Sequence, residues 1–322
     1  MTVALTGGSG VVGSAVLRQL VAAGEEVRAL ARSSSSAGVV TAGGATAVSG
    51  DLLDHQALID TFSGCDVVYH AAGVNEMCSR NPEWMYRINV DGSRAVLRAC
   101  AAAGVRRLVY TSSAVTIGEP AGVIATEKTS HRGSYLSHYE RSKHHAEQAV
   151  LGETTPVEVV AVNPSSVQGP GRSSGTGEII LRVLSGRLPV LVESTVSIVD
   201  IDDCARGHLL AGETGLPGER YLLSGFTTTV SAAVSLAADA LGREVDVKLV
   251  PTWLAGLGAG AVEAGARLRR RRPRLCREMV RVVAHGHSYD GSRATRELGL
   301  EYTAPNETLR RLVQWLVAED LL

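Results

Sequence analysis

The chain has 322 residues, of which 45% are hydrophobic and only 4% aromatic, and its formal net charge is -1. This length allows one large domain or two medium ones with a sizeable core, which Ala, Val and Leu must build because aromatic side chains are scarce. A net charge this close to zero gives no argument for a nucleic-acid or membrane partner, so neither is expected.

The first 165 residues alternate short apolar strands with helical patterns. The expected strands cover residues 3–5, 27–30, 45–48, 67–70, 107–110 and 158–162. The expected helices cover residues 11–23, 53–62, 84–104 and 139–151, and Asp54 is a candidate N-cap of the second. Such alternation predicts an α/β fold, a parallel sheet with helices on both faces, which right-handed crossovers make doubly wound. Ligands of this Rossmann-type fold bind beyond the carboxyl ends of the strands.

The pattern loosens after residue 165. Residues 169–177 are expected to form a loop and residues 196–201 a strand. Further helices are expected at residues 178–184, 202–211, 230–241, 275–283 and 308–321. We interpret residues 1–165 as a dinucleotide-binding domain. Residues 166–322 are expected to form a smaller, mainly helical substrate lobe, from which some strands and helices return to the first domain.

Cysteine usage and the lack of long apolar runs indicate a cytoplasmic protein. No stretch of about 18 apolar residues occurs, so no membrane-spanning helix is expected, and the N-terminus has no signal-peptide pattern. No two cysteines have CxxC spacing, and their number is odd: Cys65, Cys78, Cys100, Cys204 and Cys276. We therefore expect buried free thiols in a reducing compartment rather than a disulfide framework.

A glycine-rich turn lies between the first strand and the first helix, where it reads Thr-Gly-Gly-Ser-Gly-Val-Val-Gly from Thr6 to Gly13. Glycines permit the tight turn, let backbone N–H groups approach a pyrophosphate and allow the helix to pack closely on the strand. The start of the helix adds partial positive charge for the same anion. The turn predicts a dinucleotide site formed by Gly7, Gly8, Ser9, Gly10, Val11 and Val12, with Gly13 at the helix contact.

The end of the second strand favours NADP(H) over NAD(H). NAD sites usually place an acidic residue there, but this chain has Ala31, followed by Arg32, whose guanidinium suits a 2′-phosphate. NAD(H) stays open as the alternative, as does a solvated role for Arg32. After the third strand, Asp51 and Leu52 are placed to contact the adenine. After the fourth strand, small residues leave room for the cofactor: Ala71, Ala72 and Gly73.

A tyrosine and a lysine lie one helical turn apart at Tyr139 and Lys143, on one face of the expected helix. A nearby cation favours the phenolate, which makes Tyr139 usable as a proton donor or acceptor near neutral pH. Thr111, Ser112 and Ser113 end the fifth strand, so one hydroxyl there can polarise a substrate carbonyl. The set predicts hydride chemistry coupled to proton transfer.

These motifs resemble the extended short-chain dehydrogenase/reductase superfamily, the NAD-dependent epimerase/dehydratase family, over nearly the whole chain. Its TGxxGxxG stands at Thr6 to Gly13 and its YxxxK at Tyr139 to Lys143. The resemblance implies that Ser113 is the catalytic serine and that Lys143 also holds the nicotinamide ribose. Relatives often dimerise, so a homodimer is one option, and the oligomeric state stays open. It further implies that these residues lie near the cofactor: Asn89, Thr111, Pro164, Ser165 and Ser166.

Within the superfamily, the segments VRALAR and TSSAVTIG are most similar to the dihydroflavonol-4-reductase and 3β-hydroxysteroid dehydrogenase branches. The resemblance therefore implies a reductase or dehydrogenase acting on a small organic carbonyl or alcohol. A nucleotide-sugar epimerase or dehydratase with tightly bound NAD is the alternative. Many of those carry an arginine where this chain has Val196, whereas Asn163 fits the epimerase pattern. A third hypothesis, a cofactor-binding scaffold without turnover, is disfavoured by the intact catalytic set.

Two further patterns are weighed and mostly set aside. Residues 267–274, the arginine run, hold six arginines, which we interpret as a solvated helix end stopped by Pro273; an anion site is the alternative. His144 and His145 do not predict a metal site, because adjacent helical residues point to different faces. The sequence does not identify the substrate.

Overall fold

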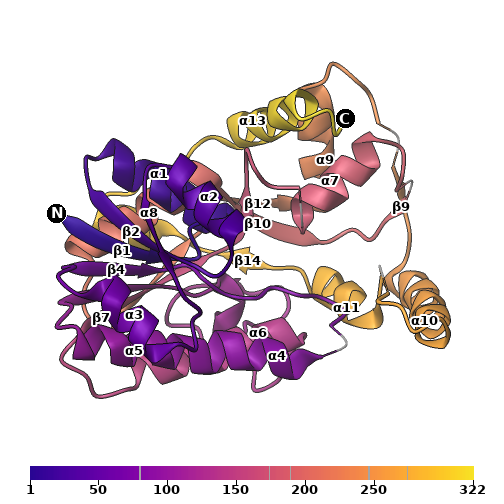
Figure 1. The fold of residues 1–322 in the computed structure, drawn as a ribbon. Coiled ribbons are helices and arrows are strands. Elements are labelled where there is room, and N and C mark those ends of the chain that lie inside the picture. The colour runs from indigo at the N-terminus through magenta and orange to yellow at the C-terminus, as the bar shows by residue number, and fades with distance from the viewer. Residues whose placement is uncertain (80, 174, 189, 246, 274) are drawn as a thin grey trace.

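Seven parallel strands form the central sheet of the computed structural model, which describes residues 1–322 except Arg80, Ser174, Pro189, Asp246 and Arg274. The strands are β1 (Thr2–Thr6), β2 (Glu26–Ala31), β3 (Thr46–Ser49), β4 (Val67–His70), β5 (Arg107–Thr111), β7 (Glu158–Pro164) and β11 (Arg220–Leu223). Their order is β11-β7-β5-β4-β1-β2-β3 (Figure 1). The direction of winding reverses on either side of β1, so a ligand crevice is expected at the carboxyl ends of β1 and β4.

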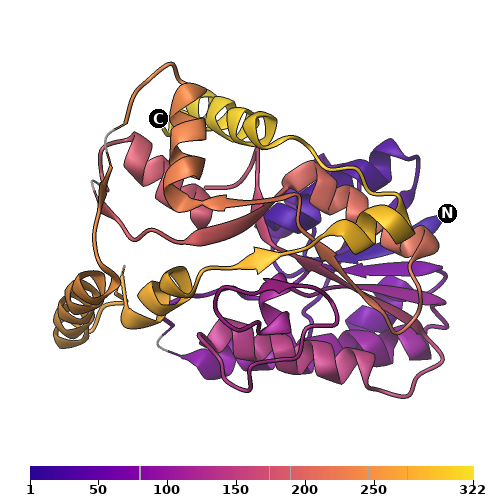
Figure 2. The ribbon, with the colours of Figure 1, turned by 180° about the vertical axis from the view of Figure 1, so that it is seen from behind.

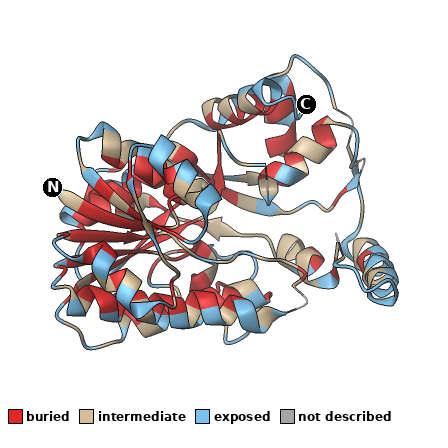
Figure 3. Cartoon of the chain, viewed as in Figure 1, coloured by how far each residue is buried: buried red, intermediate tan, exposed pale blue. Residues whose placement is uncertain are grey.

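Helices cover both faces of this sheet, which confirms the predicted doubly wound α/β fold. One face carries α1 (Val11–Ala22), α2 (Ser34–Ala42), α8 (Ile201–Thr214) and α12 (Ser292–Leu298). The other face carries α3 (His55–Phe62), α5 (Gly92–Ala102) and α6 (His138–Leu151). Two buried apolar clusters result, and Figure 3 shows the strands between them as the most continuously buried part of the molecule.

The second half of the chain builds a smaller lobe with its own apolar cluster. Its sheet has the order β12-β10-β8, formed by β8 (Ser166–Gln168), β10 (Thr195–Asp200) and β12 (Phe226–Thr229). Around it pack α7 (Thr176–Leu184), α9 (Val230–Asp239) and α13 (Pro305–Ala318). β14 (Ser288–Tyr289) pairs with β6 (Ile124–Ala125), and Figure 2 shows the arrow of β14 from behind near the centre of the molecule.

Two helices extend beyond both parts. α10 (Thr252–Leu268) packs on α11 (Arg277–His285), and Figure 1 shows α10 at the edge of the molecule, away from the central sheet. The pair of short strands β9 (Val190–Leu191) and β13 (Lys248–Leu249) leads into α10. Among the described residues, no helix has both the length and the apolar composition needed to cross a bilayer.

Several elements differ from their predictions. The expected helix 84–104 is divided into α4 (Pro82–Tyr86), a π-helix (Arg87–Asp91) and α5. The sequence analysis missed α2, α10 and α12, and it missed β11 as the seventh strand. α2 is rich in serine and has only Val40 buried, so it lacks an apolar stripe. β11 has four residues, too few for a period to show.

The expectation that every cysteine is a free thiol is wrong for two of the five. Cys78 and Cys276 form a disulfide bond across a sequence separation of 198, whereas Cys65, Cys100 and Cys204 are buried free thiols. α11 lies beside the loop after β4, where Glu278 accepts hydrogen bonds from the backbone N–H groups of Cys78 and His138. This proximity arises from tertiary packing, so cysteine count and spacing carry no signal for it.

Candidate active site

The glycine turn, Gly7 to Gly13, leaves no room for side chains at its two closest approaches. Gly7 has φ 77°, and a Cβ there would lie 2.5 Å from the backbone nitrogen of Ala72. A Cβ at Gly13 would lie 2.1 Å from the carbonyl oxygen of Gly7. The turn thus lies directly against the end of β4, at the reversal point of the sheet.

The start of α1 is open to an anion. Its N-cap residue Gly10 makes no side-chain capping bond, and its first turn has no acidic residue. Gly10 donates its own N–H to Gly7 at 2.9 Å, which closes the turn. A backbone cradle that a Cβ would fill, facing an uncapped helix start, fits a dinucleotide pyrophosphate. The other predicted turn residues lie at this edge: Gly8, Ser9, Val11 and Val12.

A buried hydrogen-bonded chain links the start of the turn to β4. Ser93 donates its hydroxyl to the carbonyl of Asn89 at 2.6 Å, so it accepts from Nε2 of His70 at 3.0 Å. Nδ1 of His70 therefore accepts from the Thr6 hydroxyl at 2.6 Å. Burial lowers the pKa of His70 to about 3, so the ring is neutral. Thr6 consequently aligns β1 with β4 through its side chain.

The predicted adenosine end is laid out along β2 and β3. Arg32 follows β2 directly and is exposed, with no hydrogen bond to any described residue. Beside it, Ser33 and Ser36 form a capping box at the start of α2. Asp51 follows β3, and one of its carboxylate oxygens accepts from the N–H of Leu53 at 3.0 Å. Leu52 is buried.

Asn89 sits in the π-helix and clamps the segment after β4. Its side chain accepts from the N–H of Val74 at 2.7 Å and donates to the carbonyl of Val74 at 2.9 Å and to Ser142 at 2.9 Å. A π-turn often marks a functional position, because it re-aims one side chain. Here it fixes Ala71, Ala72 and Gly73 between the glycine turn and α6.

Tyr139 and Ser113 meet at the carboxyl edge of the sheet. Tyr139 is the second residue of α6, Ser113 follows β5, and their side chains form a hydrogen bond. Burial raises the pKa of Tyr139, while the bond to Ser113 and the charge of Arg172 act in the opposite direction. The net direction is upward, so Tyr139 holds its proton at neutral pH.

Lys143 is buried and turned toward β5. Its ammonium donates to the hydroxyl of Tyr110 at 3.0 Å and to the carbonyl of Thr111 at 2.6 Å. Burial lowers its pKa to about 7, against the charge of Glu147. The sequence analysis expected Lys143 to lower the pKa of Tyr139. In the structure the cation that does so is Arg172, from the loop after β8.

A second buried hydrogen-bond network joins α6 to β7, to β11 and to the residues after β5. Glu147 is fully buried one turn beyond Lys143, and it accepts from Thr116 at 3.0 Å, from Asn163, and from Arg220 at 3.0 Å. Asn163 also donates to the carbonyl of Ser113 at 3.2 Å. The amide nitrogen of Asn163 thus bonds to protein groups, and its side chain is fully buried rather than open to a diphosphate.

Thr111 is oriented by a histidine. Nδ1 of His208 lies 2.7 Å from the carbonyl of Cys204 and must donate to it. Burial lowers the pKa of His208 to about 4, so Nε2 is unprotonated and accepts from the Thr111 hydroxyl at 2.9 Å. Thr111 is therefore held by its side chain toward α8, while its carbonyl faces Lys143.

Two hydroxyls near the ends of β5 and β7 are buried without a hydrogen-bond partner among the described residues: those of Ser112 and Ser165. Pro164 ends β7, and Ser166 bonds to Thr176 at 2.9 Å. The structure thus places the predicted residues after β7 at the same edge as Tyr139. Unpaired buried hydroxyls at such an edge are a feature of sites that receive a ligand.

Sequence reasoning missed Arg172, Glu147 and His208. Arg172 lies in a glycine-rich loop, and no local sequence pattern predicts the path of such a loop. Val196, at the position where many epimerases have an arginine, lies in β10. Glu147 had a weak signal, an acidic residue four positions after Lys143 on the same helix face. The single histidine of α8 carried none.

Comparisons with known proteins agree with this geometry. The model of the NAD dependent epimerase/dehydratase family matches residues 3–224. A putative dihydroflavonol 4-reductase of Synechocystis sp. is 34% identical over 97% of this chain and 93% of its own length. Sterol demethylase protein B of Methylococcus capsulatus is 30% identical over 98% of each chain. The crystal structure of gox2253 covers 100% of this chain and 99% of its own with a TM-score of 0.86 and 30% identity.

Proposed function

This chain belongs to the NAD-dependent epimerase/dehydratase family of extended short-chain dehydrogenases/reductases, and on that premise we propose that it is an NADP(H)-dependent carbonyl reductase. The observation that carries the proposal is the hydrogen-bonded pair of Ser113 and protonated Tyr139, set on the same sheet edge as the glycine turn. The names of two relatives, a reductase and a sterol-processing protein, support a small organic substrate.

The residues divide the chemistry between them. When bound, the nicotinamide supplies the hydride that reduces a carbonyl carbon, or accepts it in the reverse direction. Ser113 donates a hydrogen bond to the carbonyl oxygen and polarises it. Tyr139 then transfers its proton to that oxygen as the alkoxide forms, and its raised pKa keeps the proton available for this step.

Arg172 and Lys143 have different roles in the proposed mechanism. The charge of Arg172 stabilises the Tyr139 phenolate that remains after proton transfer, until this phenolate takes a proton back from solvent. Lys143 lies one turn along the same helix, where its ammonium holds the carbonyl of Thr111 and is placed to bind the nicotinamide ribose. Its pKa of about 7 leaves it charged below neutrality.

Net reduction distinguishes the proposal from epimerisation. We expect NADPH absorbance at 340 nm to fall in proportion to alcohol formed when the protein is given a panel of ketones and aldehydes. A product formed from a nucleotide sugar with no net change in cofactor would instead support the epimerase alternative. Burial of Asn163 and the apolar Val196 in the position of the diphosphate-binding arginine support the reductase.

Arg32→Ala is expected to weaken NADPH binding by about 10–100-fold, because charge-assisted hydrogen bonds contribute about 1.5–3 kcal/mol. NADH binding should change by less than about threefold, since NADH lacks the 2′-phosphate. Dissociation constants from cofactor fluorescence measure both. Arg98→Ala, which removes an exposed arginine on α5, is the matched control and should leave both constants unchanged. Equal losses for the two cofactors would exclude the 2′-phosphate role.

A further inference from the structure

The large hydrophobic side chains of α10 are mostly exposed. Its most exposed large side chains are Trp253 at 67%, Leu257 at 61% and Leu268 at 88%, and Leu254 and Val262 are exposed as well. Among its residues only Ala259 is buried. A helix on the surface of a globular protein normally turns polar residues to water. α10 instead exposes large apolar side chains from its first turn to its last, and Figure 3 shows its ribbon as largely exposed at the edge of the molecule.

The helix α10 carries two charged residues, of which Glu263 is partly buried and Arg267 is exposed. Glu263 and Arg267 are the only two within the helix, and they pair at 2.6 Å. Glu263 also accepts from the N–H of Arg277 on α11 at 3.4 Å. The large apolar side chains that α10 exposes form what we call the apolar face, defined by Trp253, Leu254, Leu257, Val262 and Leu268. Arg267 is exposed next to Leu268 at the end of the helix.

Positive charge borders the apolar face. The arginine run begins in the last turn of α10 and continues beyond it, with Arg274 outside the described residues. Arg272 is paired with Glu76, whereas Arg269 and Arg271 have no carboxylate partner among the residues that the structure describes. An apolar helix face next to unneutralised arginines is the pattern of a helix that lies in the interface of an anionic bilayer.

We propose that α10 and the arginine run dock this protein onto the surface of a lipid bilayer containing anionic lipids. Leu254, Leu257 and Leu268 enter the boundary between headgroups and acyl chains, and Trp253 lies at headgroup level, as tryptophan does at membrane interfaces. The arginines bind lipid phosphates. In this arrangement α10 lies along the bilayer surface and does not cross it.

The charges favour a bilayer over a second copy of this chain. A partner helix would have to offer carboxylates to Arg269 and Arg271, but the first turn of α10 has no acidic residue. The single acidic residue of α10, Glu263, is already paired with Arg267. Phospholipid headgroups supply negative charge for Arg269 and Arg271, and acyl chains cover the apolar face at the same time.

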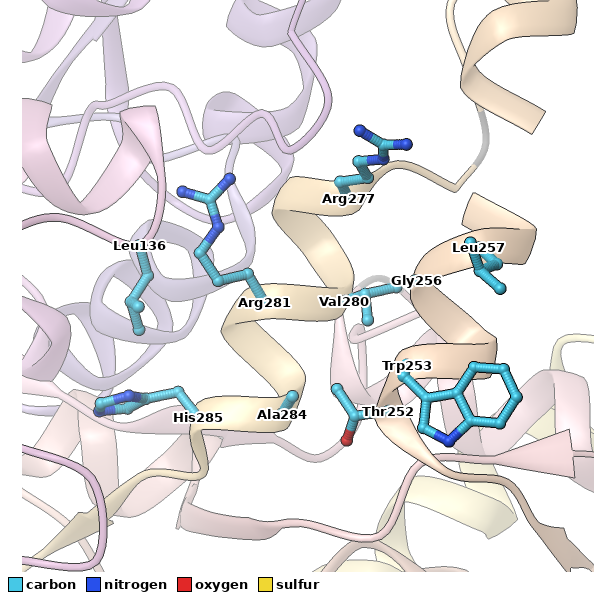
Figure 4. Close-up of a pocket in the computed structure, with 10 residues that line it drawn as sticks. All are labelled: Leu136, Thr252, Trp253, Gly256, Leu257, Arg277, Val280, Arg281, Ala284 and His285. Carbon is cyan, nitrogen blue, oxygen red and sulfur yellow. The ribbon is translucent and has the colours of Figure 1, made fainter. Parts of the chain in front are cut away.

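Docking would direct a cleft between α10 and α11 toward the bilayer. Its first cavity, of about 630 Å³, has an apolar part formed by Trp253, Leu257, Val280, Ala284 and Leu136 and a polar part formed by Arg277, Arg281 and His285 (Figure 4). A second cavity of about 770 Å³ adjoins it at Leu136 and is bordered by Arg141, Arg271 and Arg281. Leu136 lies just before α6, so the cleft leads from the docking helix to the start of the catalytic helix.

Vesicle binding tests the proposal independently of turnover. The wild type should co-sediment with phosphatidylcholine vesicles containing about 30 mol% phosphatidylglycerol, bind pure phosphatidylcholine more weakly, and dissociate as salt rises. The emission of Trp253 should shift to the blue on binding, and Trp253→Phe should remove most of that shift. Leu254→Glu with Leu257→Glu should weaken binding at least tenfold, and Arg269→Glu with Arg271→Glu should abolish the preference for anionic vesicles.

The control is Leu216→Glu, which places the same charge at a leucine 53% exposed just after α8, far along the chain from α10. It should bind vesicles like the wild type. Circular dichroism and NADPH binding show that each variant is folded. Wild-type protein that fails to bind anionic vesicles, or a Leu254/Leu257 variant that binds as well as wild type, overturns the proposal. The proposal also fails if the wild type is a dimer that does not bind vesicles and the Leu254/Leu257 variant is a monomer. In that case a second copy of the chain would cover the apolar face.

Discussion

Replacing Tyr139 with phenylalanine is expected to lower the rate of carbonyl reduction by about 10²–10⁴-fold, the range that a positioned general acid contributes. The change removes one hydroxyl, which is the proton donor and the partner of Ser113. Single-turnover oxidation of NADPH measures the effect. Cofactor affinity should stay close to that of the wild type, since the glycine turn and Arg32 are untouched.

Tyr135→Phe is the matched control for that experiment. Tyr135 lies on the loop before α6, where its ring packs against His131 and His144, and no described residue hydrogen-bonds to its hydroxyl. It should keep nearly full activity. A Tyr139→Phe variant that also kept full activity would show that another group donates the proton, and the mechanism proposed above would be wrong.

Glu147→Ala is expected to lower the free energy of unfolding by about 3–5 kcal/mol, the cost of removing one partner of a buried ion pair. Glu147 is fully buried, and its loss removes the one carboxylate that Arg220, Asn163 and Thr116 share as an acceptor. Glu147→Gln should cost less, because its amide oxygen still accepts. Urea denaturation followed by circular dichroism gives both values.

Arg220→Met completes a double-mutant cycle with Glu147→Gln. Since the two side chains share an ion pair, the loss in the double variant should be smaller than the sum of the single losses. Strict additivity would mean that the pair contributes nothing beyond packing. Glu147→Gln should also lower the pKa of Lys143 further, because the charge of Glu147 is what opposes the effect of burial there.

The parts of the site that sequence reasoning predicted well are those encoded locally. The glycine turn needs particular residues at fixed offsets, because a Cβ at Gly7 or Gly13 meets backbone atoms. Tyr139 and Lys143 share a helix, so their spacing alone places them on one face. The strands β1, β4 and β5 were recognisable because buried parallel strands are continuous apolar runs.

What could not be predicted depends on where distant segments meet. Arg172 reaches Tyr139 through a loop whose path is set by packing, and Lys143 turns toward Tyr110 because the ends of α6 and β5 lie together. The pKa of Tyr139 is raised because the phenol is buried, and the spacing of residues in the sequence gives no information about burial. The overall composition and the near-zero net charge likewise gave no indication that α10 exposes large apolar side chains.

The disulfide between Cys78 and Cys276, which both line the second cavity, covalently joins the start of α11 to the loop after β4 in the sheet domain. Cys276 directly precedes α11, and residues 269–275 separate it from the end of α10. α11, on which α10 packs, is therefore joined to the loop beyond β4 by a covalent bond. Whatever surface α10 binds is thus tethered to the sheet domain through α11 and this bond as well as along the chain.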